Sequence, residues 1–310
     1  MRSRPGAPTM ASPEPVAWVL NLDAEDELAR GGAHTPTDVM AARIEGLLPR
    51  LRGLVREGDQ VVWPGHEAVE KGLFGRAWCL TRWARTKLEQ AGVRTPRGPA
   101  VEVLRRVNHR RFAHELGQAL PTAGWAATME LLHAFITNDA LKEVSVERCW
   151  LIKRPLGYAG RGRRMLRPGQ LTAADQAWLD ASLRDGDGLQ VEPLVARELD
   201  CALHGWLSED GRCTFGQPTL QRLDTTGAWQ ATELAPLLTQ TELHLLTTEA
   251  ERTAAALHAA GYFGPFGLDA FRWRAPDGQL HFQPRSEVNA RYSMGWAVGM
   301  GDFRPPAATN

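Results

Sequence analysis

The stretch Glu287-Val288-Asn289-Ala290-Arg291 decides the fold of this chain of 310 residues, and it lies 18 positions after Asp269. If residues 280–291 form a strand, its Glu, Asn and Arg share one face, because side chains alternate along a strand. A turn at Pro276-Asp277-Gly278 would bring Asp269 alongside. Two carboxylates and an amide oxygen are ligands that Mg²⁺ prefers, and an Arg beside them suits a phosphate. The stretch therefore predicts a metal site on a hairpin; the alternative is a polar edge strand with solvated charges.

A second motif combines an apolar run with a glycine-rich loop. Residues 150–152 are Trp-Leu-Ile and lead into Lys153, and the loop that follows contains Gly157, Gly160 and Gly162 among several Arg residues. Glycine lets backbone N–H groups approach phosphate oxygens closely, and a Lys acts on them as a point charge. A Gly/Arg loop alone is more often an exposed connection. Its position directly after a strand Lys favours phosphate binding.

The third motif is Glu192-Pro193-Leu194-Val195, which ends an apolar run and is followed by Glu198 and Asp200. Alternation from Glu198 places the apolar residues 199, 201 and 203 on a buried face and the two acids on the opposite face. The segment reads as a strand, a short connection and a second strand. An amphipathic strand with an acidic outer face is the simpler alternative.

These motifs, in this order, resemble the ATP-grasp fold. The resemblance implies that ATP is bound between two halves of the fold. Lys153, Gly160 and Gly162 would contact its phosphates, and the backbone of Glu192, Pro193, Leu194 and Val195 would contact adenine. Glu198 would contact the ribose, with Asp200 as the competing candidate. Two Mg²⁺ ions, or Mn²⁺, would be held by Asp269, Glu287 and Asn289.

A vaguer match precedes these motifs, at residues 107–117. Arg110 stands where members of the ATP-grasp group often carry a Lys that reaches the adenine side of ATP, and His109 and Arg111 are neighbouring alternatives. Arg is planar and rigid whereas Lys is a flexible point charge, so the replacement is not neutral. By the resemblance, Arg110 contacts the nucleotide.

Composition is that of an ordinary globular protein, with 43% apolar and 23% charged residues. The 36 basic and 36 acidic residues balance, which argues against a nucleic-acid or anionic-membrane surface. The four cysteines are scattered and suggest neither zinc nor a disulfide framework. No apolar run reaches the length of a signal or membrane segment, so we expect a cytoplasmic protein.

The expected fold class is α/β (α+β), an ATP-grasp fold preceded by a Rossmann-like domain without a Gly-x-Gly-x-x-Gly motif. We expect disordered tails at 1–15 and 304–310. The expected domains are a pre-ATP-grasp domain at 16–105, a lid-containing half at 106–192 and a metal-binding half at 193–303. Periodicity predicts helices at 37–55, 78–91, 129–136, 172–183 and 241–260, and strands at 17–21, 60–63, 198–207 and 213–217.

The function implied by the resemblance is a ligase that activates a carboxylate as an acyl-phosphate and joins it to an amine or thiol. Arg291 would stabilise the acyl-phosphate. Arg285 would contact the carboxylate substrate from the face of Glu287, although Arg285 and Ser286 stand where we expect apolar residues. The expected partners are a small carboxylate and an amine, with no nucleic acid or membrane, and a homodimer is compatible with them. The alternatives are a phosphotransferase that stops at a phosphorylated product and a nucleotide-binding module without turnover.

Overall fold

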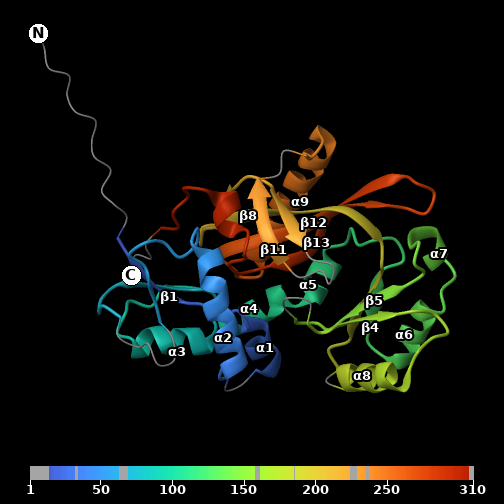
Figure 1. Ribbon diagram of the computed structural model, residues 1–310, viewed down its shortest axis with the longest axis horizontal. Coiled ribbons are helices and arrows are strands. Elements are labelled where there is room, and N and C mark those ends of the chain that lie inside the picture. Colours follow the sequence, from blue (N-terminus) through green and yellow to red (C-terminus); the bar gives the residue numbers. More distant parts are fainter. Residues whose placement is uncertain are drawn as a thin grey trace, which may run out of the picture.

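The computed structural model describes residues 14–31, 34–62, 69–157, 161–184, 186–223, 229–234 and 237–306. Most of both expected tails and the predicted phosphate contact Gly160 lie outside these ranges. Three separate sheets organise the chain, and Figure 1 shows them as an N-terminal unit on the left, a large sheet in the upper centre and a lid on the right. Within the described ranges, no helix is long and apolar enough to cross a bilayer.

The N-terminal unit is a parallel three-stranded sheet in the order β2-β1-β3 with helices around it. Its elements are β1 (Val16–Val19), α1 (Ala24–Arg30), α2 (Asp38–Leu47), a 3-10 turn (Leu48–Leu51), β2 (Gln60–Val61), β3 (Phe74–Ala77) and α3 (Arg82–Gln90). Parallel strands with crossover helices are the arrangement expected of a Rossmann-like unit.

Two expectations for this unit need correction. The predicted helix at 78–91 begins later, at Arg82, because the side chain of Thr81 caps it by accepting a hydrogen bond from the backbone N–H of Ala84. Residues 78–81 instead connect it to β3, which the sequence did not reveal because Phe74-Gly75-Arg76-Ala77 has no clear alternation. The α-helical part of the predicted helix at 37–55 ends at Leu47. The 3-10 turn that follows contains Pro49, which does not fit the interior of an α-helix.

The lid is an antiparallel four-stranded sheet in the order β4-β7-β5-β6, with helices packed on one face. Its elements are β4 (Gly124–Ala126), α6 (Met129–Ile136), α7 (Leu141–Val144), β5 (Trp150–Lys153), β6 (Arg163–Leu166), α8 (Ala173–Leu183) and β7 (Leu189–Pro193). Trp150 and Ile152 of β5 are fully buried against α6 and α8. Alternation therefore turns the other face of the sheet, with Lys153, away from these helices.

The large sheet is antiparallel, in the order β11-β10-β8-β12-β13 with β9 paired to β8. Its elements are β8 (Ala196–Leu207), β9 (Cys213–Phe215), β10 (Thr219–Leu223), β11 (Trp229–Leu234), α9 (Gln240–Ala259), β12 (Gly264–Arg274), β13 (Leu280–Asn289) and α10 (Trp296–Met300). Cys201, Leu203 and Leu268 are buried in one core with Leu246 and Ala250 of α9. The predicted alternation of β8 is confirmed, and its acidic face is opposite α9.

Two short helices join the N-terminal unit to the rest, α4 (Val101–Asn108) and α5 (Arg110–Glu115). Arg105 of α4 donates to the backbone carbonyl of Leu28 in α1, and its Nη2 lies 2.8 Å from Asp187 in the turn before β7. The segment after β13 also reaches the N-terminal unit, since the N–H of Tyr292 donates to the carbonyl of Trp78 over 3.0 Å. The three parts therefore meet around α4, α5 and the end of β13.

Candidate nucleotide and metal site

The predicted hairpin is present and places the expected metal ligands on one face. In the β12–β13 register, Asp269 lies directly opposite Glu287, and Gly267 lies opposite Asn289. The turn closes with a hydrogen bond from the N–H of Ala275 to the carbonyl of Gln279. Because directly opposed residues point to the same side of a sheet, both carboxylates and the Asn289 amide project together, away from α9.

Asp269 is held by two amide side chains. The Nδ2 of Asn289 donates to its Oδ2 over 3.1 Å, and the Nε2 of Gln221 in β10 donates to its Oδ1 over 2.8 Å. Burial, and then the charge of Glu287, raises the pKa of Asp269 to about 6. A cation close to this carboxylate would therefore stabilise its ionised form. Sequence analysis did not single out Gln221.

Glu287 is in a different electrostatic state from Asp269. Burial opposes its ionisation, but Arg110, Lys153 and Arg291 together outweigh that effect and hold its pKa below the usual value. Its closest partner is Arg110, whose Nη2 lies 2.7 Å from Oε1 of Glu287. Lys153 belongs to the lid sheet, so the face of the lid that carries it acts on the β12–β13 hairpin, which carries the predicted metal ligands and is called the metal hairpin below.

The lysine strand forms a second polar face. Lys153 pairs with Gln190 and Leu151 with Glu192 in the β5–β7 register, which places Lys153 and Glu192 on the side opposite α6 and α8. Lys153 Nζ lies 2.6 Å from Glu192 Oε2, and the Nε2 of Gln190 donates to Glu192 Oε1 over 2.8 Å. Lys153 and Glu192 are both buried, at 8% and 6% exposure. The predicted phosphate lysine is thus paired with a predicted nucleotide-binding residue.

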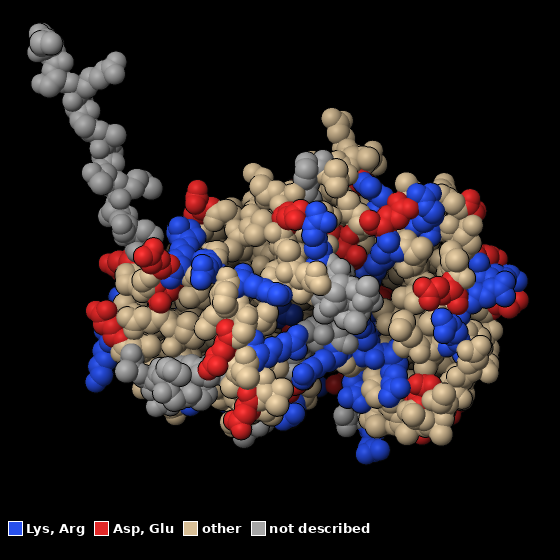
Figure 2. Space-filling view, viewed as in Figure 1, with Lys and Arg blue, Asp and Glu red and all other residues tan. Residues whose placement is uncertain are grey.

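The segment after Lys153 has the backbone features of a tight loop. Gly162 adopts a φ of 72°, which favours glycine, and its carbonyl accepts a hydrogen bond from the N–H of Arg154 over 2.8 Å. A Cβ on Gly157 would lie 2.7 Å from the carbonyl oxygen of Arg161. Only glycine fits there without a shift of the backbone. Figure 2 shows Lys and Arg side chains gathered in the middle of this face of the molecule, where the N-terminal unit meets the lid.

The connection between the sheets contains the predicted adenine contacts. The N–H of Leu194 already donates to the carbonyl of Cys149 over 2.8 Å, and its carbonyl accepts from Ser145 Oγ. A narrow pocket beside Glu192, lined from the large sheet by Phe271 and Gln283, has a volume of about 10 Å³. This is room for roughly one water molecule. The pocket marks the place where the lid sheet and the large sheet approach each other.

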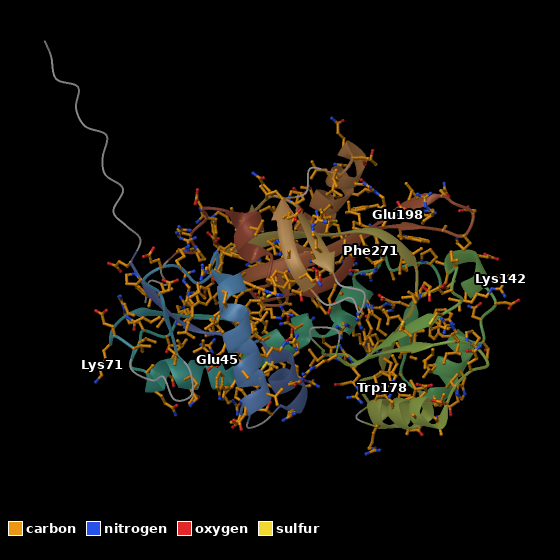
Figure 3. All side chains as sticks on the ribbon, in the orientation of Figure 1. Glu45, Lys71, Lys142, Trp178, Glu198 and Phe271 are labelled. Carbon is orange, nitrogen blue, oxygen red and sulfur yellow. The ribbon has the colours of Figure 1, made fainter. Side chains whose placement is uncertain are left out.

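Both candidates for the ribose contact carry ion pairs. Glu198 Oε1 lies 2.6 Å from Nε of Arg274, and Asp200 Oδ1 lies 2.8 Å from Nη1 of Arg197. Asp200 lies opposite Phe271 in the β8–β12 register, which puts it on the face of Asp269. Figure 3 labels Glu198 and Phe271 at the end of the large sheet that borders the lid. The choice between the two acids stays a prediction.

Arg110 lies at a different end of the site from the one we expected. Its Nη1 donates to the carbonyl of Arg154 over 2.7 Å and its Nη2 to the carbonyl of Gly157, in addition to the pair with Glu287. These are contacts with the metal hairpin and the glycine loop rather than with the connection around Leu194. The alternative Arg111 points to solvent, where it pairs with Glu115.

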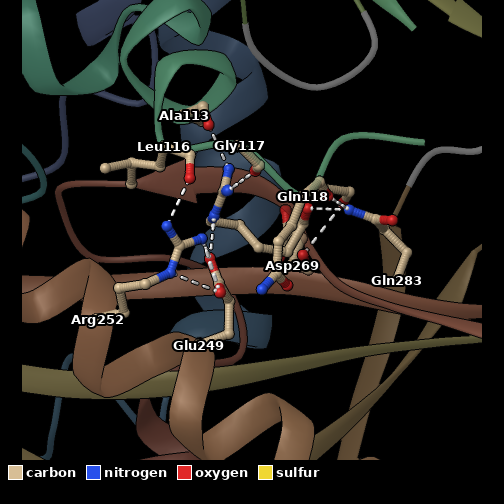
Figure 4. Close-up of polar contacts among 10 residues, drawn as sticks. Ala113, Leu116, Gly117, Gln118, Glu249, Arg252, Asp269 and Gln283 are labelled. Carbon is tan, nitrogen blue, oxygen red and sulfur yellow. Dashed lines mark hydrogen bonds and ion pairs between the residues drawn. The ribbon is translucent and has the colours of Figure 1, made fainter. Parts of the chain in front are cut away.

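Arg285 does not share the face of Glu287, and that expectation is wrong. The register shifts between Asp269 and Phe271, so that β13 carries extra residues at this point and the alternation breaks. The guanidinium of Arg285 instead pairs with Glu249 of α9 at 2.6 Å and donates to the backbone carbonyls of Ala113 and Gly117. Figure 4 shows this group of contacts, in which Arg252 also reaches Glu249.

Strand β13 ends at Asn289, two residues before the predicted end, so Arg291 lies just beyond the strand. Its Nε pairs with Oε1 of Glu25 in α1, and its guanidinium lies 5.7 Å from the ring centre of Trp78. Arg291 therefore joins the metal hairpin to the N-terminal unit. Beside it, a cavity of about 260 Å³ is lined by Trp78, Cys79 and Leu104 as well as by Ala290 and Tyr292.

No protein-family model and no curated protein sequence matches this chain. Solved structures do match, although at low identity. Biotin carboxylase from Campylobacter jejuni, in a complex with β,γ-ATP, has a TM-score of 0.55 and 13% identity, covering 94% of this chain and 72% of that chain. Carboxyaminoimidazole ribonucleotide synthase from Aspergillus clavatus, in a complex with ATP, has a TM-score of 0.51 and 12% identity, covering 95% and 78%.

Pyruvate carboxylase from Rhizobium etli has a TM-score of 0.51 and 15% identity over 92% of this chain, which spans 27% of that longer chain. These neighbours are ATP-grasp enzymes. At such identities the likeness shows the fold. Together with the two sheets that face each other across Lys153 and Glu287, it shows that this chain has the ATP-grasp fold.

Proposed function

We propose that this protein is an ATP-dependent ligase that activates a carboxylate as an acyl-phosphate and joins it to an amine or thiol. The observation that carries the proposal is the opposed pair Asp269 and Glu287, with Asn289 beside them, on a face within electrostatic reach of Lys153. Two structural neighbours of this fold were solved with ATP or an ATP analogue, which supports ATP as the nucleotide.

The ligand set fits magnesium. Two carboxylates lie directly opposite each other with the Asn289 amide alongside, and burial together with the charge of Glu287 raises the pKa of Asp269 to about 6, so a bound cation would stabilise its ionised form. Among the described residues, no group of three His, Cys, Asp or Glu side chains is arranged to hold a metal. Few protein ligands are typical of Mg²⁺ that is held jointly with phosphate oxygens. When bound, two Mg²⁺ ions would neutralise the charge of the transferring phosphoryl group.

The side chains then have distinct tasks. Lys153 would leave Glu192 to hold phosphate oxygens, and Arg291 would hold the phosphoryl group of the acyl-phosphate. A carboxylate oxygen attacks the γ-phosphorus and ADP leaves; the amine nitrogen then attacks the acyl carbon, phosphate leaves and the amine loses a proton. Positioning and charge stabilisation suffice for this chemistry, so no protein nucleophile is needed.

We place the acceptor beside Arg291, in the cavity of about 260 Å³ between the N-terminal unit and the large sheet. Trp78 and Leu104 give it mainly apolar walls, and Arg291 connects it to the end of the metal hairpin. Apolar walls with a few polar groups are usual for small-molecule sites. An acceptor with an apolar portion fits this lining best.

The test begins with a screen of small carboxylic acids and amines for substrate-dependent release of ADP. The carboxylate found in this way is then labelled with ¹⁸O on both carboxyl oxygens. Formation of an acyl-phosphate moves one labelled oxygen into the released phosphate. Labelled phosphate together with a new amide or thioester supports the proposal. Unlabelled phosphate alongside genuine ligation would exclude it, and a stable phosphorylated product would indicate a phosphotransferase.

A further inference from the structure

Arg110 connects three parts of the site through its backbone and its guanidinium. Its backbone N–H donates to the carbonyl of Pro155 over 2.9 Å, and its guanidinium donates to the carbonyls of Arg154 and Gly157. The same Nη2 that reaches Gly157 lies 2.7 Å from Glu287, 177 residues away in the sequence. The segment that follows the phosphate lysine is thereby tied to the metal hairpin by one side chain.

Each residue of the Arg110–Glu287 ion pair could bind a ligand of opposite charge in place of its partner. The carboxylate is a predicted metal ligand, so a cation would compete with Arg110 for it. The guanidinium lies beside the glycine loop, so a phosphate would compete with Glu287 for it. The Nε of Arg110 is buried and has no acceptor among the described residues, which leaves a further donor for an anion.

We propose that Arg110 and Glu287 form an exchangeable ion pair, which the metal ion and the nucleotide must break together. The cation takes Glu287 and a phosphate takes Arg110, so each ligand removes the competitor of the other. This inference rests on the proposed metal and nucleotide sites. It makes Arg110 a phosphate contact that couples the two ligands, instead of an adenine contact.

The physical reason for the coupling is the cost of an unpaired charge. The Arg110 side chain is 11% exposed and that of Glu287 29%, so neither is well solvated. A metal ion that binds alone leaves Arg110 without its partner, and a nucleotide that binds alone leaves Glu287 without one. Binding of both ligands restores a partner to each residue.

The first arm of the test removes the positive charge of Arg110 and measures metal binding. Binding of Mn²⁺ to the full chain without nucleotide is measured from the loss of the free-ion electron paramagnetic resonance signal. In Arg110→Gln, Glu287 no longer has a competing guanidinium, and we expect Mn²⁺ to bind about tenfold more tightly than in wild type. The matched control is Arg111→Gln, which removes the neighbouring exposed pair with Glu115 and should leave the affinity unchanged.

The second arm removes the negative charge of Glu287 and measures nucleotide binding. It does not depend on whether Arg110→Gln folds. Binding of ADP in EDTA is measured by calorimetry. In Glu287→Gln the guanidinium of Arg110 is released, and we expect metal-free ADP to bind about tenfold more tightly. Glu115→Gln is the matched control and should leave ADP affinity unchanged. A purely structural pair would give weaker or unchanged binding in both variants.

The outcomes separate the two proposals. Wild type that binds neither Mn²⁺ nor ADP overturns the proposed function and the exchange with it. Wild type that binds both, with no gain in affinity in either variant, overturns only the exchange. If Arg110→Gln does not fold, the ADP affinity of Glu287→Gln decides: a gain supports the exchange, and no gain rejects it.

Discussion

Strand β13 takes part in two charge clusters that differ in kind. Within the register shift, Arg285 pairs with Glu249, to which Arg252 also donates, and backbone carbonyls accept hydrogen bonds from the other nitrogens of Arg285. After the shift, Glu287 faces the like-charged Asp269, and its closest cationic partner, Arg110, comes from helix α5. In the first cluster a single carboxylate is shared by two guanidinium groups that also donate to backbone carbonyls, whereas the second cluster brings two carboxylates directly opposite each other.

This difference separates a structural cluster from a functional one without reference to sequence motifs. The side chains of Arg285 and Glu249 are each 3% exposed. Removing Glu249 would leave Arg285 buried without an ion-pair partner, and removing Arg285 would leave Glu249 with Arg252 alone. The carboxylate of Asp269 has its pKa raised to about 6 and gains from an added cation. We therefore expect substitutions in the first cluster to change stability, and those in the second to change ligand binding and turnover.

The largest effect is expected for Glu287→Ala, measured as kcat/KM once a substrate is known. Removal of a ligand that acts on the transferring phosphoryl group should lower the rate by about a thousandfold. The free energy of unfolding should change by about 1 kcal/mol or less, because the loss of the pair with Arg110 is offset by relief of the repulsion between Glu287 and Asp269, and the buried core stays intact. A fully active variant would show that Glu287 is not a metal ligand.

The reverse pattern is expected for Arg285→Ala. It leaves the buried Glu249 with only the partly exposed Arg252, and should destabilise the protein by about 3 kcal/mol. Urea unfolding measures this loss. Arg252→Ala is the control and should cost about 1 kcal/mol or less, since the Arg252 side chain is 40% exposed and Glu249 keeps its buried partner Arg285. If the folded Arg285→Ala protein binds Mn²⁺ less tightly than wild type, the separation of the two clusters fails.

The pH dependence of metal binding is the next largest effect. The pKa of Asp269 is raised to about 6, mainly by burial and then by Glu287, so protons compete with the metal below that pH. We expect Mn²⁺ affinity to be level above pH 7 and to fall by up to about tenfold per pH unit below 6. Titration of Mn²⁺ binding between pH 5 and 8 measures it. A midpoint near 4 would mean that Asp269 has an ordinary pKa.

The same shift affects the stability of the metal-free protein with a defined sign. Because the pKa is higher in the folded state than the ordinary value of 3.8, the contribution of Asp269 is complete below pH 3.8 and is lost as the pH rises through about 6. Asp269→Asn does not titrate. The stability of wild type relative to this variant should therefore fall between pH 4 and pH 7.

The parts of the site that the sequence predicted depend on local patterns. The turn at residues 276–278 and the alternation on either side are sufficient to predict that Asp269 lies beside Glu287. The apolar run before Lys153 likewise predicted a strand with this lysine at its end. These features involve neighbouring residues, and for that reason they can be read without knowledge of the rest of the fold.

The parts that were missed depend on distant packing. The bulge that redirects Arg285 is associated with contacts to Glu249 and to the carbonyls at the end of α5, more than 30 residues away in the sequence. The direction of Arg110 is set in the same way by a strand 177 residues away. The short strands β10 and β11 carry mixed polar residues, so neither their pairing nor the position of Gln221 follows from periodicity.

The smallest effect is expected for Gln221→Ala, which refines the second cluster without removing a charge. Gln221 donates to Oδ1 of Asp269 while Asn289 donates to Oδ2, so these two amides orient the carboxylate and favour its ionised form. Loss of one donor should weaken Mn²⁺ binding about threefold and move its pH midpoint upward. Gln230→Ala, on the exposed face of β11, is the matched control and should change neither quantity. A lower midpoint in Gln221→Ala would mean that the amide does not stabilise the charged carboxylate, and that Asp269 relies on Asn289 alone.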